Sequence, residues 1–229
     1  MKKITKKTSM PATIYKFNNT KKSGFNFPDF FFIDTSFLIN SFFPVPEKIF
    51  SRINIICSDF LTLLETKAKS EEICLFTDNY VLNEFFFYIL KNKVESVDFF
   101  TTPYDRHIQE YKDKGRKNPL SELLKDHHEL IAKYYHLLKY YYERIMAIPI
   151  AVLEADHLQT KTTETVTEKM CNIVELYNIL PADALNIAIA QEAGINDFIV
   201  IDADFHRVDG INVYTCISNR SPCSICPRK

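Results

Sequence analysis

The sequence has little of what nucleotide-triphosphate-binding and membrane proteins require. It contains four glycines and no GxxxxGK phosphate loop, which argues against nucleotide-triphosphatase folds. No apolar run is long enough to span a membrane. The lysine-rich N-terminus is not followed by an apolar stretch, so it does not resemble a signal peptide. We therefore expect a cytoplasmic protein without a membrane partner.

Charge is nearly balanced over the whole chain but unevenly distributed. The formal net charge is -1, which does not indicate a protein covered by nucleic acid. Seven lysines nevertheless fall between Lys2 and Lys22, and the first acidic residue is Asp29. We predict that residues 1–27 form a mobile basic arm able to follow phosphates by charge attraction. A solubilising tail explains the same composition equally well.

The six cysteines divide into two groups. Cys57, Cys74 and Cys171 lie in apolar stretches and are expected to be reduced core residues. Cys216, Cys223 and Cys226 lie near the end, where Cys223 and Cys226 form one CxxC pair. A structural zinc site usually needs two such pairs. Residues 218–229 are therefore predicted to be a tail, with a zinc site as the alternative.

Strand-like and helix-like segments alternate along the chain, which predicts an α/β fold. The strand-like runs are mostly apolar throughout, as in parallel strands covered on both faces. Pro149 places its strand at a sheet edge or at a strand start. Thr77 and Asp78 are suited to cap the following helix, and Gly194 to end the helix after Asp183. The predicted strands, about five in number, are 30–34, 73–77, 147–153, 198–202 and 212–216.

One segment lies outside this plan. We predict one domain over residues 28–217, interrupted by a helical insertion at about 97–146. The insertion begins with a basic, turn-like stretch whose candidate nucleic-acid contacts are Lys112, Lys114, Arg116 and Lys117. It continues as an aromatic amphipathic helix from Ser121 to Ile145. Packing on the core is the simplest role for that helix; a dimer interface or a base-stacking RNA surface are alternatives.

Four acidic residues follow or adjoin these predicted strands. Asp34 and Asp202 each end an apolar run, Glu84 follows the second strand, and Asp183 opens a helix. Sites in open α/β sheets form at the carboxyl ends of strands. Carboxylates gathered there repel one another, and a divalent cation is the simplest compensation.

Each acid also has an ordinary structural explanation. Asp34 and Asp183 suit helix starts, where the helix dipole favours an acid. Glu84 suits a solvated helix surface, and Asp202 suits a turn shared with Asp204. The metal site is favoured over these separate explanations because all four acids are expected at one edge of the sheet.

These segments together resemble the PIN domain family. The resemblance rests on FFFIDTSFLI at residues 30–39, VLNEF at 81–85, ADALNIAIA at 182–190 and FIVIDADF at 198–205, in this order. It covers about residues 30–216, interrupted by the insertion. It implies a three-layer α/β/α sandwich with a central parallel sheet. Such proteins are commonly Mg²⁺- or Mn²⁺-dependent ribonucleases, and many are toxins of toxin-antitoxin pairs.

By position, the resemblance implies that Asp34, Glu84, Asp183 and Asp202 are the catalytic, metal-binding acids. Asp204 is a candidate fifth ligand, and Thr35 and Ser36 are candidates to support the site by hydrogen bonding. Mg²⁺ prefers such oxygen ligands and keeps several waters, one of which can attack a phosphodiester. The implied partners are RNA and, for the toxin subgroup, an antitoxin protein.

The sequence also departs from the family pattern. Val200 stands where the family often has Thr, and the insertion makes the chain longer than compact toxins. These departures leave open a PIN-fold nucleic-acid-binding or scaffold module with weak or no catalysis. A receiver-like domain is disfavoured because the last strand offers no lysine. A phosphatase is disfavoured because Asp34 is not followed by the second Asp of a DxDxT motif.

Overall fold

The computed structural model describes residues 12–17, 25, 27–42, 51–94, 110, 113–115, 122, 125–154 and 164–217. The chain forms two compact units, one from Met1–Val81 with Pro149–Lys229 and one from Leu82–Ile148. The second unit includes the predicted insertion. The described elements are β1 (Thr13–Lys16), β2 (Phe30–Ile33), α1 (Thr35–Phe42), α2 (Ser51–Lys69), β3 (Cys74–Asp78), α3 (Asn79–Val94), α6 (Glu129–Met146), β4 (Ile150–Leu153), α7 (Val166–Tyr177), α8 (Pro181–Glu192), β5 (Asp197–Ile199), the 3-10 helix η4 (Ala203–Arg207) and β6 (Asn212–Thr215).

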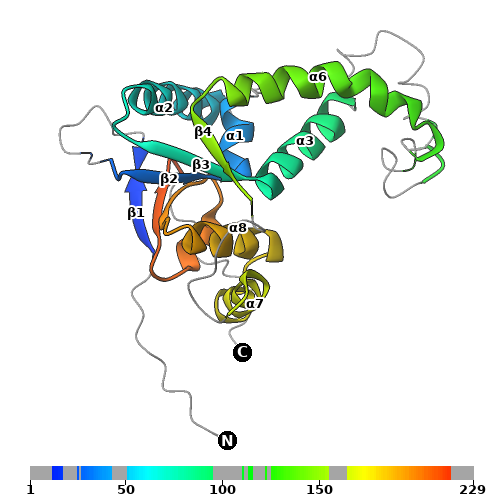
Figure 1. Cartoon of the computed structure of the whole chain (residues 1–229). Coiled ribbons are helices and arrows are strands. Elements are labelled where there is room, and N and C mark those ends of the chain that lie inside the picture. The colour runs from blue at the N-terminus through cyan, green and yellow to red at the C-terminus, as the bar shows by residue number, and fades with distance from the viewer. Residues whose placement is uncertain are drawn as a thin grey trace, which may run out of the picture. The chain divides into compact units, whose positions relative to one another are not determined.

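The first unit is built on a parallel sheet whose strand order is β1-β6-β5-β2-β3-β4. Helices α1 and α2 lie on one side of this sheet, and α7 and α8 lie on the other (Figure 1). The predicted α/β class and parallel sheet are confirmed, and the arrangement is compatible with a three-layer α/β/α sandwich. The order places the carboxyl end of β2 between those of β3 and β5.

The described sheet has six strands rather than the five predicted. The additional strand is β1, which comes from residues 13–16 of the predicted basic arm and pairs with β6. Its apolar side chains explain the pairing. Tyr15 stacks on Tyr214 of β6 with ring centroids 4.7 Å apart, and Phe17 at the end of the strand is 2% exposed. The sequence prediction gave more weight to the surrounding lysines than to these aromatic residues.

The central strands are buried on both faces, as their continuous apolar runs predicted. Phe31, Phe32 and Ile33 of β2 have no exposed surface, although successive side chains of a strand point to opposite faces. Strand β4 lies at an edge of the sheet and begins directly after Pro149. The prediction for this proline is confirmed, because a residue without an N–H is tolerated at such a position.

Local hydrogen bonds fix where the helices begin and end. Thr165 and Glu168 form a capping box at the start of α7, so the helix begins at Val166. Residues 155–163, which precede this helix in the sequence, lie outside the described part of the chain. Helix α8 ends at Glu192, and Gly194, which was predicted to end it, follows two residues later with φ 83° and donates its N–H to the Gln191 carbonyl.

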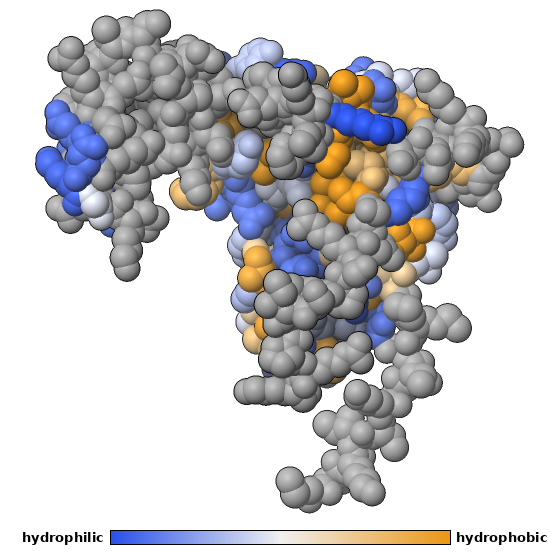
Figure 2. Space-filling view, turned by 180° about the vertical axis from the view of Figure 1, so that it is seen from behind, coloured by the Kyte–Doolittle hydropathy of each residue, from blue (hydrophilic) through white to orange (hydrophobic). Residues whose placement is uncertain are grey.

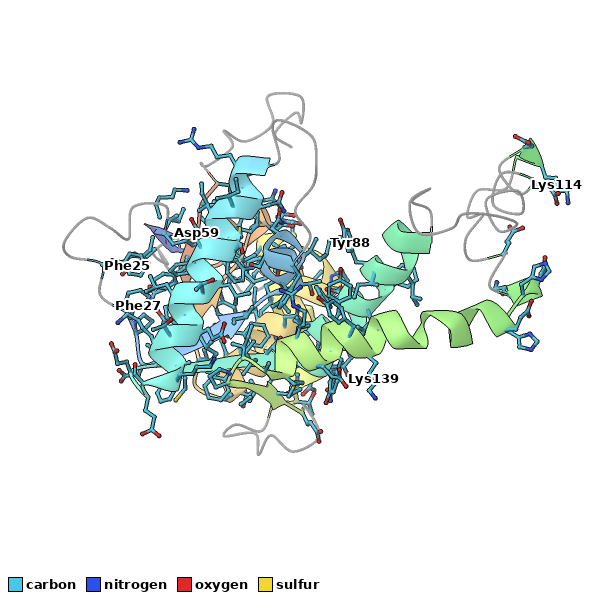
Figure 3. All side chains as sticks on the ribbon, turned by 90° about the horizontal axis from the view of Figure 1, so that it is seen from above. Phe25, Phe27, Asp59, Tyr88, Lys114 and Lys139 are labelled. Carbon is cyan, nitrogen blue, oxygen red and sulfur yellow. The ribbon has the colours of Figure 1, made fainter. Side chains whose placement is uncertain are left out.

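Aromatic side chains join α2 to the sheet. Phe60 of α2 stacks on Phe17 with centroids 4.3 Å apart. Phe25 and Phe27 also lie against α2 (Figure 3), each within 6.3 Å of the Phe60 ring. Some apolar residues remain at the surface, and orange apolar areas lie between blue polar ones on the face in Figure 2. The described exposed ones in this unit include Ile55, Leu176 and Leu180.

In the second unit, helix α6 packs against α3. Tyr141 and Ile145 are buried, and the Tyr141 ring meets the Phe85 ring of α3 edge to face at 6.2 Å. The neighbouring Tyr140 and Tyr142 are 52% and 46% exposed. Packing therefore accounts for one side of the predicted aromatic helix. The continuous helix begins at Glu129 rather than Ser121, and His128 provides no side-chain hydrogen bond to its first turn.

Candidate functional site

Asp34 lies at the carboxyl end of β2, immediately before α1, and is 4% exposed. Its Oδ2 atom accepts hydrogen bonds from the backbone N–H of Ser36 at 3.0 Å and from the Ser36 hydroxyl at 2.6 Å. Asp34 therefore does begin a helix, as its ordinary explanation held. The same two bonds fix the orientation of its carboxylate and leave Oδ1 facing other neighbours.

Ser36 connects Asp34 to the loop that follows β5. Its hydroxyl donates to Asp34 and accepts the backbone N–H of Ile201 at 2.9 Å. One hydroxyl can fill both roles because it carries one proton and two lone pairs. This bond brings the loop that carries Asp202 to the start of α1. The Thr35 hydroxyl lies 3.4 Å from the Val81 carbonyl.

Helix α8 supplies a further contact to Asp34. The Asn186 side chain is 1% exposed, and its Nδ2 atom lies 3.5 Å from Asp34 Oδ1. Within the described residues, the buried Oδ1 atom of Asn186 has no hydrogen-bond partner. A buried oxygen without a donor is costly, and a cation would satisfy it. Sequence reasoning assigned Asn186 no role, although a buried-looking amide among the apolar residues of this helix was a usable signal.

Asp183 precedes Asn186 by three residues, in the first turn of α8. Residues three apart share a helix face, so Asp183 lies on the face that presents Asn186 to Asp34. Asp183 is half-buried, and the N-terminal end of a helix favours an acid there. The structure thus places Asp183 and Asp34 on adjoining elements.

Asp202 and Asp204 are held differently. Asp202 is exposed and caps η4, accepting the Asp204 backbone N–H at 2.8 Å. The Asp204 carboxylate forms an ion pair with Arg207 at 2.8 Å. These contacts match the ordinary turn explanation for Asp202. Its loop still follows β5, the neighbour of β2 in the sheet.

Asp78 is an acid at this edge that the sequence analysis treated only as a helix cap. It does cap α3, accepting the Val81 N–H at 2.8 Å, and it is fully buried. Phe32 pairs with Phe76 across β2 and β3, so Asp34 and Asp78 each lie two residues beyond paired positions. Two adjacent buried carboxylates repel each other, which favours a nearby positive charge.

The remaining predicted residues belong to the second unit or lie outside the described residues. Glu84 is a half-buried residue of α3 in the second unit, and the edge described above belongs to the first unit. Lys114 is exposed in a turn of the second unit (Figure 3). Lys112, Arg116, Lys117, Cys223 and Cys226 lie outside the described residues, as does the tail 218–229.

Basic groups lie toward the other half of the same sheet edge. Lys16 ends β1, and His206 lies in η4 beyond Asp202. Burial and the Lys16 charge lower the pKa of His206, and the charge of Asp202 partly opposes them. Neither residue was predicted from the sequence, because Lys16 was assigned to the basic arm and the last candidate ligand was Asp204.

The donor chemistry of this edge fits a hard cation, because carboxylate and amide oxygens are the ligands that Mg²⁺ accepts. The residues are not gathered into a closed ligand shell. In the part of the chain that the structure describes, no group of three or more His, Cys, Asp or Glu side chains is arranged to hold a metal ion. The most complete part of the candidate metal site is the oriented pair of Asp34 and Asn186, with Asp183 one helical turn before Asn186.

Two further observations bear on function. A concavity of about 500 Å³ along α7 is lined by Glu164, Thr167, Glu168, Cys171 and Asn172, and none of the predicted acids lines it. Among the described helices, none combines the length and apolar character needed to cross a membrane.

In comparisons with known proteins, no family model, curated protein or solved structure matches the chain.

Proposed function

We propose that this chain is a Mg²⁺- or Mn²⁺-dependent endoribonuclease with a PIN-like fold. The observation that carries the proposal is the carboxylate of Asp34. It is 4% exposed, oriented by Ser36 on one oxygen, and accompanied on the other by the buried amide of Asn186. Burying an oriented carboxylate is costly unless the charge is compensated. The proposed activity is inferred from the sequence resemblance, and RNA is the proposed substrate.

Asp34 Oδ1, Asn186 Oδ1 and the Asp183 carboxylate are the atoms that would hold the ion. A bound divalent ion supplies an activated water and neutralises charge that develops on the phosphate. Ser36 engages Asp34 Oδ2, so Oδ1 is the oxygen that would bind the ion. Asp202, exposed on the adjoining loop, is the proposed acceptor for the proton of the attacking water. Glu84 and Asp204 remain predicted ligands from the sequence.

The test compares Asp34→Asn with Asp59→Asn. Asp59 is exposed on α2 of the same unit (Figure 3), so its variant controls for the loss of one charge. Both variants and the wild type are incubated with mixed single-stranded and structured RNAs, with Mg²⁺, with Mn²⁺ or with chelator. We expect metal-dependent cleavage by the wild type and by Asp59→Asn alone. Undiminished cleavage by a folded Asp34→Asn protein would refute the proposal.

A second candidate is a PIN-fold RNA-binding or scaffold module without efficient catalysis. Its support is that the described residues form no group of three potential metal ligands from His, Cys, Asp and Glu. The exposed Tyr140 and Tyr142 of α6 offer rings on which bases stack. RNA retention in chelator, with no cleavage under any metal condition, would favour this candidate. An antitoxin or a second copy of the chain as partner is proposed from the resemblance and from α6.

A further inference from the structure

Two cysteine side chains far apart in sequence meet inside the first unit. Cys57 lies on α2 and is fully buried, whereas Cys216 follows β6 directly and is half-buried. Their sulfur atoms are 4.0 Å apart, although 159 positions separate the two residues. The sulfurs are therefore in contact without being bonded. Neither cysteine is among the acids and the amide assigned to the candidate metal site.

The surroundings make the two thiols unequal. Lys16 lies on the neighbouring strand β1, paired with Thr215, and its ammonium donates to the carbonyl of Ile217. The contact with the Cys57 thiol and the positive charge of Lys16 lower the pKa of Cys216. The contact with Cys216 and burial raise the pKa of Cys57. Cys216 is thus the thiol that ionises first and is also the more accessible of the two.

We propose that Cys216 is a hydroperoxide-reactive thiol and that Cys57 converts its oxidation product into an intramolecular disulfide. The Cys216 thiolate attacks one oxygen of hydrogen peroxide, the O–O bond breaks, and hydroxide leaves with a proton from solvent as water. Cys216 becomes a sulfenic acid. The Cys57 sulfur then attacks the Cys216 sulfur, and the S–O bond breaks. The second oxygen and the Cys57 proton leave as water, so two thiols are oxidised and one peroxide is reduced.

Among the described cysteines, the geometry favours Cys57 as the partner of Cys216. A disulfide has an S–S length of about 2.05 Å, so the two sulfurs must approach by about 2 Å. Cys216 lies just past the last residue of β6, where no strand pairing fixes it. A small shift of this residue can close the gap while α2 stays in place. Cys74 and Cys171 are exposed but lack this paired setting, which makes them internal controls.

The test uses the full chain and limiting hydrogen peroxide, followed by alkylation, proteolysis without reductant and mass spectrometry. We expect one linked peptide pair, Cys57 with Cys216, that dithiothreitol separates. In Cys57→Ser, oxidation should stop at the Cys216 sulfenic acid, which dimedone traps. Cys216→Ser should leave Cys57 reduced, and Cys171→Ser should behave as wild type. A Cys216 disulfide to Cys223 or Cys226, or oxidation of Cys74 and Cys171 as fast as Cys216, would overturn the proposal.

Lys16 provides an independent test that leaves both thiols present. Lys16→Gln removes the charge that favours the thiolate, so dimedone labelling of Cys216 in the Cys57→Ser background should slow several-fold. Lys139→Gln, exposed on α6 of the second unit, should leave the rate unchanged. Equal rates in the two variants would contradict the assigned reactivity. Because the disulfide closes a long loop, the oxidised wild type should also melt at a higher temperature than the reduced protein.

Discussion

The two halves of the sheet's carboxyl edge carry opposite chemistry. Around β2 and β3, buried acids are held by hydrogen bonds to Ser36, Asn186 and backbone N–H groups. Around β1 and β6, the edge carries Lys16 and a contacting pair of thiols. The first half is formed by β2 and β3, which have a strand on each side, whereas the second includes β1, one of the two outermost strands. One edge of a parallel sheet can thus orient acids at its centre and adjust thiol reactivity at its margin.

The largest expected difference between the halves is in core packing. Phe32→Ala on β2 removes a fully buried ring and should lower the free energy of unfolding by about 3–5 kcal/mol. Tyr15→Ala on β1 removes a ring that is 38% exposed and should cost less than half as much. Urea unfolding of both variants measures the difference. Equal losses would show that the two halves of the edge are equally well packed.

Removal of the Ser36 hydroxyl should have the next largest effect. Ser36→Ala leaves the Ile201 N–H without its acceptor and removes one donor from Asp34. We expect a loss of about 1–3 kcal/mol in unfolding free energy, because buried polar groups lose their partners. Cleavage should fall about 10–100-fold, because the orientation of Asp34 is lost. Ser58→Ala, an exposed residue of α2, is the control and should change neither quantity.

The ion pair beside Asp202 should matter much less. Arg207→Ala removes the 2.8 Å contact with Asp204, in which both side chains are partly exposed, and a 3.2 Å hydrogen bond to the Asn178 carbonyl. Exposed pairs of this kind contribute about 0.2–1 kcal/mol. Thermal unfolding at low and high salt should show a small difference between variant and wild type that salt reduces. A loss as large as that of Ser36→Ala would mean that the Asp202 loop is fixed as firmly as Asp34.

The smallest effect should be a pH dependence at His206. Burial and Lys16 hold its pKa below the ordinary value of 6.5, so the folded state resists protonation. The stabilisation is complete above pH 6.5, where the imidazole is neutral in both states, and declines as pH falls through the lowered pKa. His206→Gln should therefore show a shallower loss of melting temperature below pH 6.5. An unchanged slope would contradict the assigned environment.

The sequence predicted the centre of the fold better than its margin. Runs such as Phe30–Ile33 are apolar on both faces, so they identified parallel strands and the acid at their ends. Strand β1 was missed because its two apolar positions lie among lysines. Pairing with β6 outweighed that composition. Asn186 was missed because its amide gains meaning only from its proximity to Asp34.

Other contacts leave no trace in a single sequence. Cys57 and Cys216 are 159 positions apart, and only the packing of α2 near the end of β6 brings them together. Cys57 was correctly predicted to be buried, but its partner was not identifiable. Cys74 and Cys171 were predicted to be core residues and are exposed. Cys74 lies in a strand and Cys171 in a helix, and the apolar residues near each cysteine in the sequence lie on the opposite face of that element.

The most direct test of the central claim is Mn²⁺ binding followed by electron paramagnetic resonance of the free ion, since it needs no knowledge of the RNA target. Wild type, Asp34→Asn, Asn186→Ala and Asp59→Asn are titrated after circular dichroism has shown that each is folded. We predict saturable binding by wild type and by Asp59→Asn, weaker binding by Asn186→Ala, and none by Asp34→Asn. Equal binding by wild type and Asp34→Asn would contradict the account.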